Sequence, residues 1–538
     1  MYSDSVYQKM FKRRSLICYI VIMLMFFGSI LRVAVISNTD YTEVYKSQNC
    51  IKLKISNQRG TVFDRNMIPL TNNRKKIIAA VSPTPRAVTA ISTVLNAEQM
   101  KSLTERLKSS KPVICEVPEK IVCDGIVCLD VYETDKSSLP AIHTIGYTDS
   151  DGKGVSGIEK AYDDILFCED AATVYYECNA KGTVLEGVSP RVEYDSSISA
   201  NGVITTIDYR LQIIVEELAN QIETGAIVVA DAKNGKIRAI ASVPTFSAND
   251  IHNYLNLPDS PLLNRTINCY NVGSAFKPCV AIAGMNNNKS NFVYNCTGSC
   301  EIIDRFFKCH KRDGHGLMNL KTGLANSCNT YFYNFAFNIG GDEILKVASE
   351  LKFGNSLKLS ENYYTVKGNL PNPETLKNIA NLANFSIGQG ELLLSPISIL
   401  TLYSAIANKG VYYTPSLVEG TVKDGKIDKY NIGNPTRVTD EKTADILKEY
   451  LVSVLTDGTG SEALSDTVTT AGKTATAQTG KFENGIEICC GWFCGFFPVE
   501  NPEYVVTVFS ENTARQNISC AKIFSQIADK ITQQKNGL

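Results

Sequence analysis

A run of uncharged, mostly apolar residues near the N-terminus constrains this chain more than any other feature. It extends from Ser15 to Leu31, and after Arg32 one more apolar turn reaches Ile36. Its uncharged part, roughly 17 residues, has the minimum length of a membrane-spanning helix, and Arg32 can extend its side chain to the membrane surface. The alternative, a cleaved signal peptide, would have a shorter apolar core and a small-x-small cleavage site, and no such site follows Leu31. We therefore expect an uncleaved anchor over residues 15–36.

Basic residues before this run predict its orientation. The four that precede it are Lys9, Lys12, Arg13 and Arg14. Positive charge flanking a membrane helix stays on the cytoplasmic side. We expect residues 1–14 in the cytoplasm and the rest of a single-pass protein outside the cell.

The charge balance excludes one class of partner. Lys and Arg number 54, Asp and Glu number 55, and the formal net charge is -1. A protein that binds the phosphate backbone of a nucleic acid needs a basic surface, so we expect no nucleic-acid partner. With 538 residues, the chain is long enough for more than one domain.

The apolar pattern becomes regular near Asn201 and from there predicts helices packed on an antiparallel sheet, an α+β fold. A turn with Asn234-Gly235 joins two apolar runs and is a strong hairpin signal. The elements predicted for this part are a strand 203–206, a helix 209–222, strands 226–231, 237–243, 491–497 and 504–510, and a helix 519–532. Before Asn201 the pattern is less regular, with a strand at 77–81 and an amphipathic helix at 97–108.

The segment Asn271-Val-Gly-Ser-Ala-Phe-Lys-Pro278 holds the first chemical motif. Ser274 and Lys277 are spaced so that one helical turn brings them together. A Lys can serve as the base for a neighbouring Ser if its pKa falls toward neutrality. Alone, Ser-x-x-Lys is weak evidence, because it occurs by chance in a chain of this length.

Two later segments strengthen this interpretation. Ser327-Cys328-Asn329 supplies a hydroxyl and an amide, with no catalytic role expected for the Cys328 side chain. Gly472-Lys473-Thr474-Ala475 supplies a cation and a hydroxyl on a predicted edge strand. Ser-x-x-Lys, Ser-x-Asn and Lys-Thr-Gly in this order are typical of penicillin-binding proteins and serine β-lactamases.

The chain resembles a class B, or monofunctional, penicillin-binding protein, a peptidoglycan D,D-transpeptidase. Further segments in the family's order are Arg59–Asn66, His143–Tyr147, Gly154–Tyr162, Thr206–Asp208, Leu211-Gln212, Asn264-Arg265, His315-Gly316, Ile387–Gly390 with Pro396, and Trp492-Phe493. The resemblance implies an elongated mixed α/β pedestal, or dimerisation-type module, over residues 37–198. It implies a β-lactamase/transpeptidase-like domain, with helices on a central antiparallel sheet, over residues 199–538.

The resemblance also implies the catalytic roles. Ser274 attacks the penultimate D-Ala carbonyl of a stem pentapeptide, and Lys277 takes the proton of Ser274. Ser327 passes a proton to the departing D-Ala, and Asn329 holds the donor peptide. The backbone N–H groups of Ser274 and Thr476 stabilise the oxyanion.

The substrate-binding strand follows the same resemblance. Lys473 and Thr474 are implied to bind the terminal carboxylate of the donor. The other substrate-binding positions are Ala475, Thr476 and Gln478. This mechanism requires no cofactor and no metal, and it makes stem peptides and β-lactams the ligands.

Two other functions share the motif trio. A serine β-lactamase would need a means of activating the water that hydrolyses the acyl-enzyme. A membrane-anchored β-lactam sensor, or an inactive scaffold of the wall-synthesis complex, would need no turnover. The sequence shows no glycosyltransferase module, so by family analogy we expect a SEDS-type glycan polymerase as partner.

The chain departs from the family pattern at three positions in the motifs. Val272 and Ala275 stand where the family usually has Pro and Thr, beside the nucleophile. Ala475 stands where the third motif usually has Gly. Its Cβ either intrudes on bulky β-lactams or is accommodated by a strand that lies slightly farther out. All reactive side chains remain, so we expect an active enzyme.

Seventeen cysteines are unusual for a chain of this length. Cys296, Cys300 and Cys309-His310, with His315 nearby, permit three interpretations: a disulfide loop, free thiols in an anoxic habitat, or a metal site. Their spacing matches no standard zinc finger.

Overall fold

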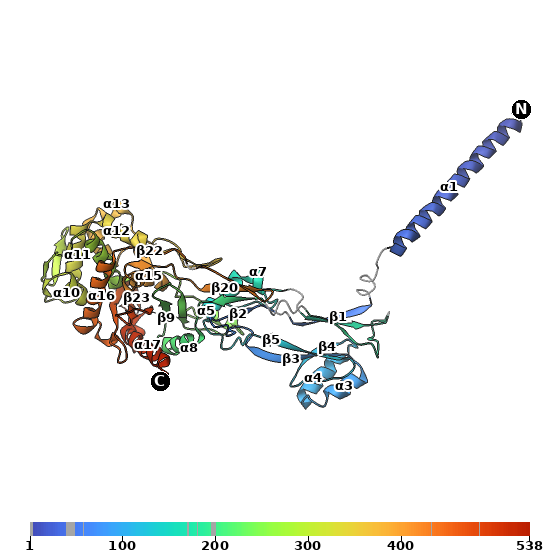
Figure 1. Ribbon diagram of the computed structural model, residues 1–538, viewed down its shortest axis with the longest axis horizontal. Coiled ribbons are helices and arrows are strands. Elements are labelled where there is room, and N and C mark those ends of the chain that lie inside the picture. Colours follow the sequence, from blue (N-terminus) through green and yellow to red (C-terminus); the bar gives the residue numbers. More distant parts are fainter. Residues whose placement is uncertain are drawn as a thin grey trace. The chain divides into compact units, whose positions relative to one another are not determined.

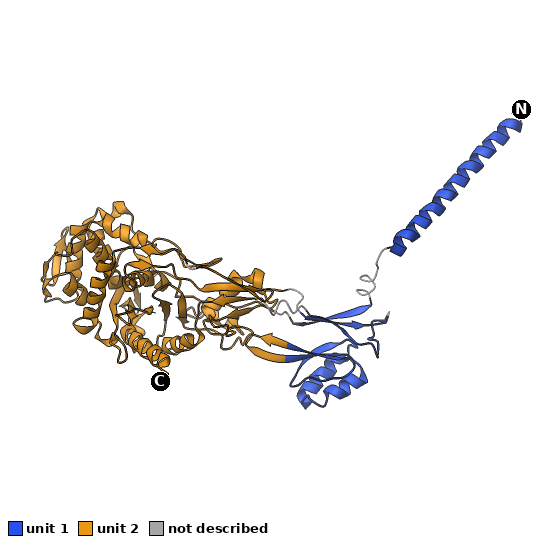
Figure 2. Ribbon diagram, viewed as in Figure 1, with its two compact units in different colours: residues 1–55, 77–130, 172–194 blue, residues 56–76, 131–171, 195–538 orange. Residues whose placement is uncertain are grey.

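The computed structural model describes residues 4–38, 49–56, 59–168, 172–179, 181–194, 201–431, 433–483 and 485–537. It divides the chain into two compact units (Figure 2). Unit 1 comprises residues 1–55, 77–130 and 172–194, and unit 2 comprises residues 56–76, 131–171 and 195–538. Segments 56–76 and 131–171, which fall inside the predicted pedestal 37–198, thus belong to the same compact unit as the predicted transpeptidase domain.

The first helix, α1 (Asp4–Asn38), contains the whole predicted anchor 15–36 (Figure 1). It has a mean hydropathy of 2.4 over its most apolar window and no buried residues. By length and composition it can cross a membrane.

The rest of unit 1 contains two small sheets and two helices. One sheet has the order β1-β6-β7, with β1 (Cys50–Ser56), β6 (Ala172–Glu177) and β7 (Arg191–Tyr194). The other has the order β4-β3-β5, with β3 (Arg74–Val81), β4 (Val113–Val117) and β5 (Ile126–Glu133). Helices α3 (Pro85–Ile91) and α4 (Ala97–Leu107) share an apolar core with this second sheet. The predicted strand at 77–81 and helix at 97–108 are confirmed.

Within unit 2, strand pairing and ion pairs hold the segments that come from the predicted pedestal. Strand β2 (Thr61–Phe63) pairs in parallel with β8 (Gly202–Thr205), in a sheet of order β2-β8-β20-β21. Arg59 is almost buried and forms ion pairs with Glu159 and Asp163. The other elements of this region are α5 (Ile142–Ile145), α6 (Gly157–Ala161), α7 (Asp163–Leu166), β20 (Val418–Lys423) and β21 (Lys426–Lys429).

The central sheet of unit 2 is antiparallel and has the order β10-β9-β25-β24-β23. Its strands are β9 (Gly225–Asp231), β10 (Ile237–Val243), β23 (Ala471–Glu483), β24 (Ile486–Phe497) and β25 (Tyr504–Ser510). Phe493 of β24 stacks on Phe524 of α17 (Cys520–Lys535). The next residue, Cys494, lies beside Tyr403 of α15 (Pro396–Ala407). Because neighbouring residues of a strand face opposite sides, α17 and α15 cover opposite faces of the sheet.

A helical region completes unit 2 and confirms the α+β class. Its larger helices are α8 (Tyr209–Ala219), α9 (Lys277–Asn286), α10 (Leu320–Ala325), α11 (Asn329–Ile339), α12 (Gly341–Glu350), α14 (Ile379–Ser386) and α16 (Glu441–Thr456). Short strand pairs lie between α9 and α10: β12 (Tyr294–Cys296) with β15 (Gly316–Met318), and β13 (Ser299–Ile302) with β14 (Arg305–Lys308). The strand predicted at 491–497 begins earlier in the structure, at Ile486. The helix predicted at 209–222 ends earlier, at Ala219.

Candidate active site

The predicted nucleophile, Ser274, lies in a 3-10 turn, η3 (Gly273–Phe276), that leads directly into α9. Gly273 has φ +59°, and a Cβ there would lie 2.9 Å from the backbone oxygen of Thr476. A side chain at this position would therefore be strained and would push against β23. The Gly273 N–H donates to the Gly388 carbonyl at 2.9 Å, and the Tyr403 hydroxyl donates to the Ala275 carbonyl at 2.9 Å. These contacts fix Ser274 at the start of α9.

Ser327 connects the first two motifs. It lies between α10 and α11 with φ +51°, a conformation that is uncommon for residues other than Gly. Its Oγ donates to the Ser274 Oγ at 3.1 Å. Lys277 Nζ donates to the Ser327 carbonyl at 2.7 Å, to the Ser327 Oγ at 3.2 Å and to Asn329 Oδ1 at 2.8 Å. The described contacts thus run from Ser274 through Ser327 to Lys277.

Both motif lysines are fully buried. Burial lowers the pKa of Lys277 to about 7, while the nearby thiols of Cys328 and Cys309 act in the opposite direction. Burial, with the charge of Lys277, lowers the pKa of Lys473 well below its ordinary value. A lysine amine that is substantially neutral near pH 7 can accept a proton, which is what a general base requires.

The third motif lies on β23, the last strand of the central sheet. Lys473 Nζ donates to the Thr474 carbonyl at 3.0 Å, and the Thr474 Oγ1 lies 2.8 Å from the Thr459 Oγ1. Gln478 Nε2 donates to Glu487 Oε2 at 2.6 Å. Since β23 is an edge strand beside η3, its free edge can pair with an extended peptide.

Ala475 is 7% exposed and belongs to the main apolar core. It pairs with Trp492, whose indole N–H donates to the Asn271 carbonyl at 2.8 Å. Side chains alternate along a strand, so Ala475 shares the face of Lys473, and Thr474 and Thr476 share the other. This packing favours the alternative in which the Cβ of Ala475 is accommodated.

Four potential metal ligands gather behind the second motif. Their ligand atoms, from Cys296, Cys309, His315 and Cys328, all lie within 4.8 Å of one another. The Cys309 Sγ lies 4.0 Å from the Cys328 Sγ and 3.5 Å from the His315 Nδ1, and the Cys296 Sγ lies 3.6 Å from the same nitrogen. Tetrahedral zinc with ordinary bond lengths would separate its ligands by about 3.6–3.8 Å. The residues therefore fit Zn²⁺.

This cluster differs from the set named in the sequence. Cys300 and His310 are outside it, and Cys328, for which we expected no role, is inside it. The three thiols are buried, and His315 is half-buried. The contact between the two thiols lowers the pKa of Cys309 and raises the pKa of Cys328. One acidic thiol beside a second is a set that favours a soft divalent cation.

Sequence reasoning found all three motifs but missed Thr459 and the contribution of Cys328. Thr459 lies in the loop Asp457-Gly-Thr-Gly460, and two glycines shortly before the third motif were the available signal. The possible metal-binding role of Cys328 was not recognised from the sequence, because Cys328 lies inside a motif whose other members already have a chemical role.

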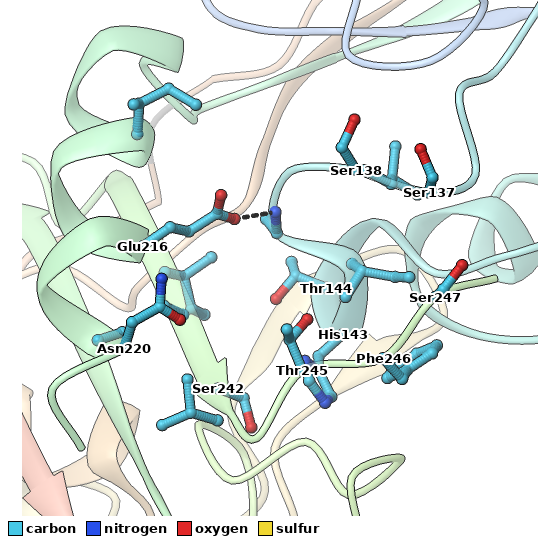
Figure 3. A pocket seen from close by; sticks show the side chains of 18 of the residues that line it. Ser137, Ser138, His143, Thr144, Glu216, Asn220, Ser242, Thr245, Phe246 and Ser247 are labelled. Carbon is cyan, nitrogen blue, oxygen red and sulfur yellow. Dashed lines mark hydrogen bonds between the residues drawn. The ribbon is translucent and has the colours of Figure 1, made fainter. Parts of the chain in front are cut away.

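A separate cavity of about 490 Å³ lies at β10, at the other edge of the central sheet from β23. Residues 137–144, α8 and β10 provide most of its wall, and Glu216 accepts a hydrogen bond from the Ala141 N–H at 2.6 Å (Figure 3). Burial raises the pKa of Glu216. None of the motif residues lines this cavity, so it is not part of the site described above.

Comparisons with known proteins identify a family that carries the same three motifs. A family model described as the penicillin binding protein transpeptidase domain matches residues 225–531. Stage V sporulation protein D of Bacillus subtilis is 26% identical over 507 residues, covering 88% of this chain and 77% of the relative. Peptidoglycan D,D-transpeptidase MrdA of Escherichia coli is 26% identical over 496 residues, covering 78% of this chain and 75% of the relative.

Solved structures show the same fold. PBP2 of Helicobacter pylori, in complex with MreC, superposes with a TM-score of 0.68 at 22% identity, covering 90% of this chain and 100% of that one. Penicillin binding protein 3 of Mycobacterium tuberculosis, complexed with ampicillin, superposes with a TM-score of 0.66 at 22% identity, covering 90% and 96%. The family match spans more than half of the chain and contains all three motifs, and the chain belongs to the penicillin-binding protein transpeptidase family.

Proposed function

We propose that this protein is a peptidoglycan D,D-transpeptidase that cross-links stem peptides through an acyl-enzyme on Ser274 and is acylated there by β-lactams. The observation that carries the proposal is the contact chain from the Ser274 Oγ through the Ser327 Oγ to Lys277 Nζ. It joins a nucleophile, a proton carrier and a base of lowered pKa in one site.

The acylation step follows from these contacts. When Lys277 is neutral, the two hydroxyls turn so that Ser274 donates to the Ser327 Oγ and Ser327 donates to Lys277 Nζ, which reverses the two bonds described above. The Ser274 Oγ then attacks the penultimate D-Ala carbonyl, and its proton passes through the Ser327 hydroxyl to Lys277. The oxyanion is stabilised by the backbone N–H groups of Ser274 and Thr476, donors that are commonly worth ~3 kcal/mol each. The carbon–nitrogen bond to the terminal D-Ala then breaks, and the departing amine takes the proton back through Ser327.

The acceptor step reverses this path. The amine of a neighbouring stem peptide attacks the ester carbonyl and loses a proton to Lys277. The bond from the carbonyl to the Ser274 oxygen then breaks, the new amide forms, and the Ser274 oxygen takes the proton back from Lys277 through Ser327. Lys473 and Thr474 bind the terminal carboxylate of the donor, and Asn329 orients the donor peptide. Ala475, Thr476 and Gln478 line the strand against which that peptide extends.

We also propose how the rest of the chain serves this reaction. Residues 15–36 anchor the protein with residues 1–14 in the cytoplasm, and residues 37–198 act as a pedestal. A SEDS-type glycan polymerase supplies the glycan strands. The PBP2 of Helicobacter pylori forms a complex with MreC, which supports a protein partner for this chain as well. The four-residue cluster holds one Zn²⁺ ion that fixes the segment of Ser327 and Asn329; it takes no part in the bond-making steps.

The test is covalent labelling of the detergent-solubilised full-length protein by a fluorescent penicillin, followed by cross-linking of lipid-linked peptidoglycan with a glycan polymerase present. Stable labelling and new cross-links, both lost in Ser274→Ala, are the expected results. Rapid release of hydrolysed penicillin would instead identify a β-lactamase. Labelling without cross-links would identify a sensor, and no labelling of the wild type would identify a scaffold.

A further inference from the structure

The cavity at β10 lies beside the second edge of the central sheet, opposite the edge formed by β23. In this sheet, β10 has one neighbouring strand, β9. On its other side, the side-chain amide of Gln212 takes the place of a strand. Its Nε2 donates to the Ile240 carbonyl at 2.8 Å, and its Oε1 accepts from the Ile240 N–H at 2.8 Å. The backbone groups of Ile240 therefore point away from β9, toward this free edge.

Ser242 has the same orientation two residues later. In an antiparallel pair, residues that bond to the partner strand alternate with residues whose backbone groups face the other side. Because the register is unbroken from Ile240 to Ser242, the N–H and carbonyl of Ser242 also face the free edge. The described hydrogen bonds of Ser242 use its Oγ instead, with the Leu263 carbonyl at 3.1 Å and the Arg265 N–H at 3.0 Å. Ser242 lines the cavity, so an added strand can pair with its backbone there.

The wall of this cavity carries one charge without a counter-ion. Glu216 is the one acidic residue among the described lining residues, and that lining contains no Lys or Arg. Its Oε1 accepts from the Ala141 N–H and, at 2.9 Å, from Gln212 Nε2, and no described ion pair includes it. Burial raises the pKa of Glu216, the effect expected for a carboxylate with no cation nearby. The cavity therefore complements a cationic group.

The rest of the wall is neutral. Burial lowers the pKa of His143 to about 4, so its imidazole is uncharged near pH 7. Figure 3 shows Glu216 and Asn220 on one side of the cavity, and Ser138 and Ser247 on the other side. A ligand that enters thus meets one carboxylate among amide and hydroxyl groups.

The dimensions of the cavity suit an extended chain. Its volume is about 490 Å³, and a second cavity of about 560 Å³ also has Ser137 and Leu139 in its wall. Each volume lies in the range of ordinary ligand sites, about 300–1,000 Å³. All residues that line the two cavities belong to unit 2. Two adjoining cavities provide the length that an extended peptide needs.

We propose that this cavity binds an extended segment of a partner protein that contains a lysine. The segment pairs through its backbone with the N–H and carbonyl of Ser242, and the lysine ammonium forms an ion pair with Glu216. This is recognition by strand addition, in which the main chain supplies affinity and a side-chain pocket supplies specificity. The inference goes beyond the proposed function, because the site is separate from the three motifs and requires no acyl-enzyme.

The test is fluorescence anisotropy with the detergent-solubilised full-length protein and labelled peptides with blocked ends. The first peptide has the sequence Val-Thr-Lys-Thr-Val. A second has norleucine in place of Lys, and a third is N-methylated at each internal amide, so that it cannot pair as a strand.

The proteins compared are the wild type, Glu216→Gln and Glu217→Gln. Gln at position 216 loses the charge but keeps an oxygen that accepts from the Ala141 N–H. Glu217 is the matched control, because it pairs with Lys530 and does not line the cavity. Equal circular dichroism spectra confirm that each variant is folded.

Glu216→Gln should weaken binding of the lysine peptide about tenfold, the lower range for a hydrogen bond to a charged group. The wild type should bind the norleucine and N-methylated peptides more weakly by about the same factor. Glu217→Gln should bind all three peptides as the wild type does.

The inference would be overturned by equal affinity of the wild type for any two of the lysine, norleucine and N-methylated peptides that include the lysine one. Undiminished binding by Glu216→Gln, or no binding by the wild type, would also overturn it. Tighter Glu216-dependent binding of a stem pentapeptide with a free amine would assign the cavity to peptidoglycan instead of a partner protein. Penicillin labelling of Ser274 in the same samples tests the proposed function independently.

Discussion

Ser327 shows how much of this site depends on single residues. Its left-handed backbone turns its hydroxyl toward Ser274 while its carbonyl accepts from Lys277. A proton leaving the nucleophile thus has a short path to a buried amine. The three residues form one unit, so their individual losses should not add.

Ser274→Ala should abolish acylation by penicillin and leave the fold intact. Only one oxygen is removed, and Ala is well tolerated in a helical turn. The measurement is intact-protein mass after incubation with penicillin, with the melting temperature as the check on folding. A penicilloyl adduct at the wild-type rate would show that another residue is the nucleophile.

The acylation rate should rise with pH through about 7 and then level off. The base must be neutral, and burial lowers the pKa of Lys277 to about 7, so lowering the pH below that value protonates it. Lys277→Met should reduce the rate at least about a hundredfold and remove this rise. Stopped-flow rates from pH 5 to 9 check it, with equal melting temperatures required at each pH. The same rise in Lys277→Met would assign it to a different group.

Ala475→Gly should leave acylation by a small penicillin and by a bulky cephalosporin within about threefold of wild type. Ala475 lines the cavity beside β23, but it is only 7% exposed and packs with the core, so its Cβ leaves little surface in the cleft. The loss of a strand side chain should cost roughly 0.5–1 kcal/mol of stability. Acylation kinetics and chemical unfolding measure the two effects. A selective gain of ten-fold or more with the cephalosporin would support the steric alternative instead.

At the scale of elements, the insertion between α9 and α10 brings distant cysteines together. Pairing of β12 with β15 places Cys296 opposite Gly316, next to His315. The turn that leads into α11 then adds Cys328, the N-cap residue of that helix. A bound metal would therefore connect a short β-insertion to the residues on either side of Cys328, which both contact Lys277.

Purified full-length protein should contain one zinc ion per chain by elemental analysis. Cys309→Ser and Cys328→Ser should each lose the metal and lower the melting temperature, because a ligand that binds only the folded state stabilises it by about 2.7 kcal/mol at a hundredfold excess over its Kd. Cys300→Ser, outside the cluster, is the control that should retain zinc. Metal-free protein with a disulfide among Cys296, Cys300 and Cys309 would support the disulfide interpretation. Metal-free protein in which these cysteines are reduced would support the free-thiol interpretation.

The elements that could be predicted are those whose signal is local. The hairpin of β9 and β10 was predicted because both apolar runs and the Asn234-Gly235 turn lie within one short segment. The start of β24 was missed because residues 486–490 extend the β23–β24 hairpin beyond the predicted strand. Phe482 and Ile486, near the tip of this hairpin, are exposed and do not belong to the core. The cluster of Cys296, Cys309, His315 and Cys328 depends on strand pairing, which spacing alone does not reveal.

At the scale of the whole molecule, the motifs could be predicted from the sequence, but the contacts between them could not. The spacing of Ser274 and Lys277 guarantees their proximity in one turn. The contact of Lys277 with Asn329, and that of Thr459 with Thr474, arise from packing between elements far apart in the sequence. The division of the chain likewise depends on long-range pairing, since β2 joins β8 and Arg59 joins Glu159.

Deleting residues 1–38 should move the protein from the membrane fraction to the soluble fraction, with its penicillin acylation rate within about twofold of the full-length value. The deleted helix is the described element that is apolar enough to cross a membrane, and every motif residue lies in unit 2. Fractionation by ultracentrifugation and labelling with fluorescent penicillin measure both outcomes. Retention of the shortened protein in the membrane fraction would point to a second attachment.

The strand order of the central sheet has a consequence for biogenesis. The middle strand, β25, pairs with β9 on one side and β24 on the other, so the sheet joins both ends of the region 225–531. During synthesis from the N-terminus, the turn that carries Ser274 emerges long before β25 does. Until then β9 has an unpaired edge, and β23 and β24 have nothing to dock against. The site beside β23 can therefore be completed only after β25 is available to join the two parts of the sheet.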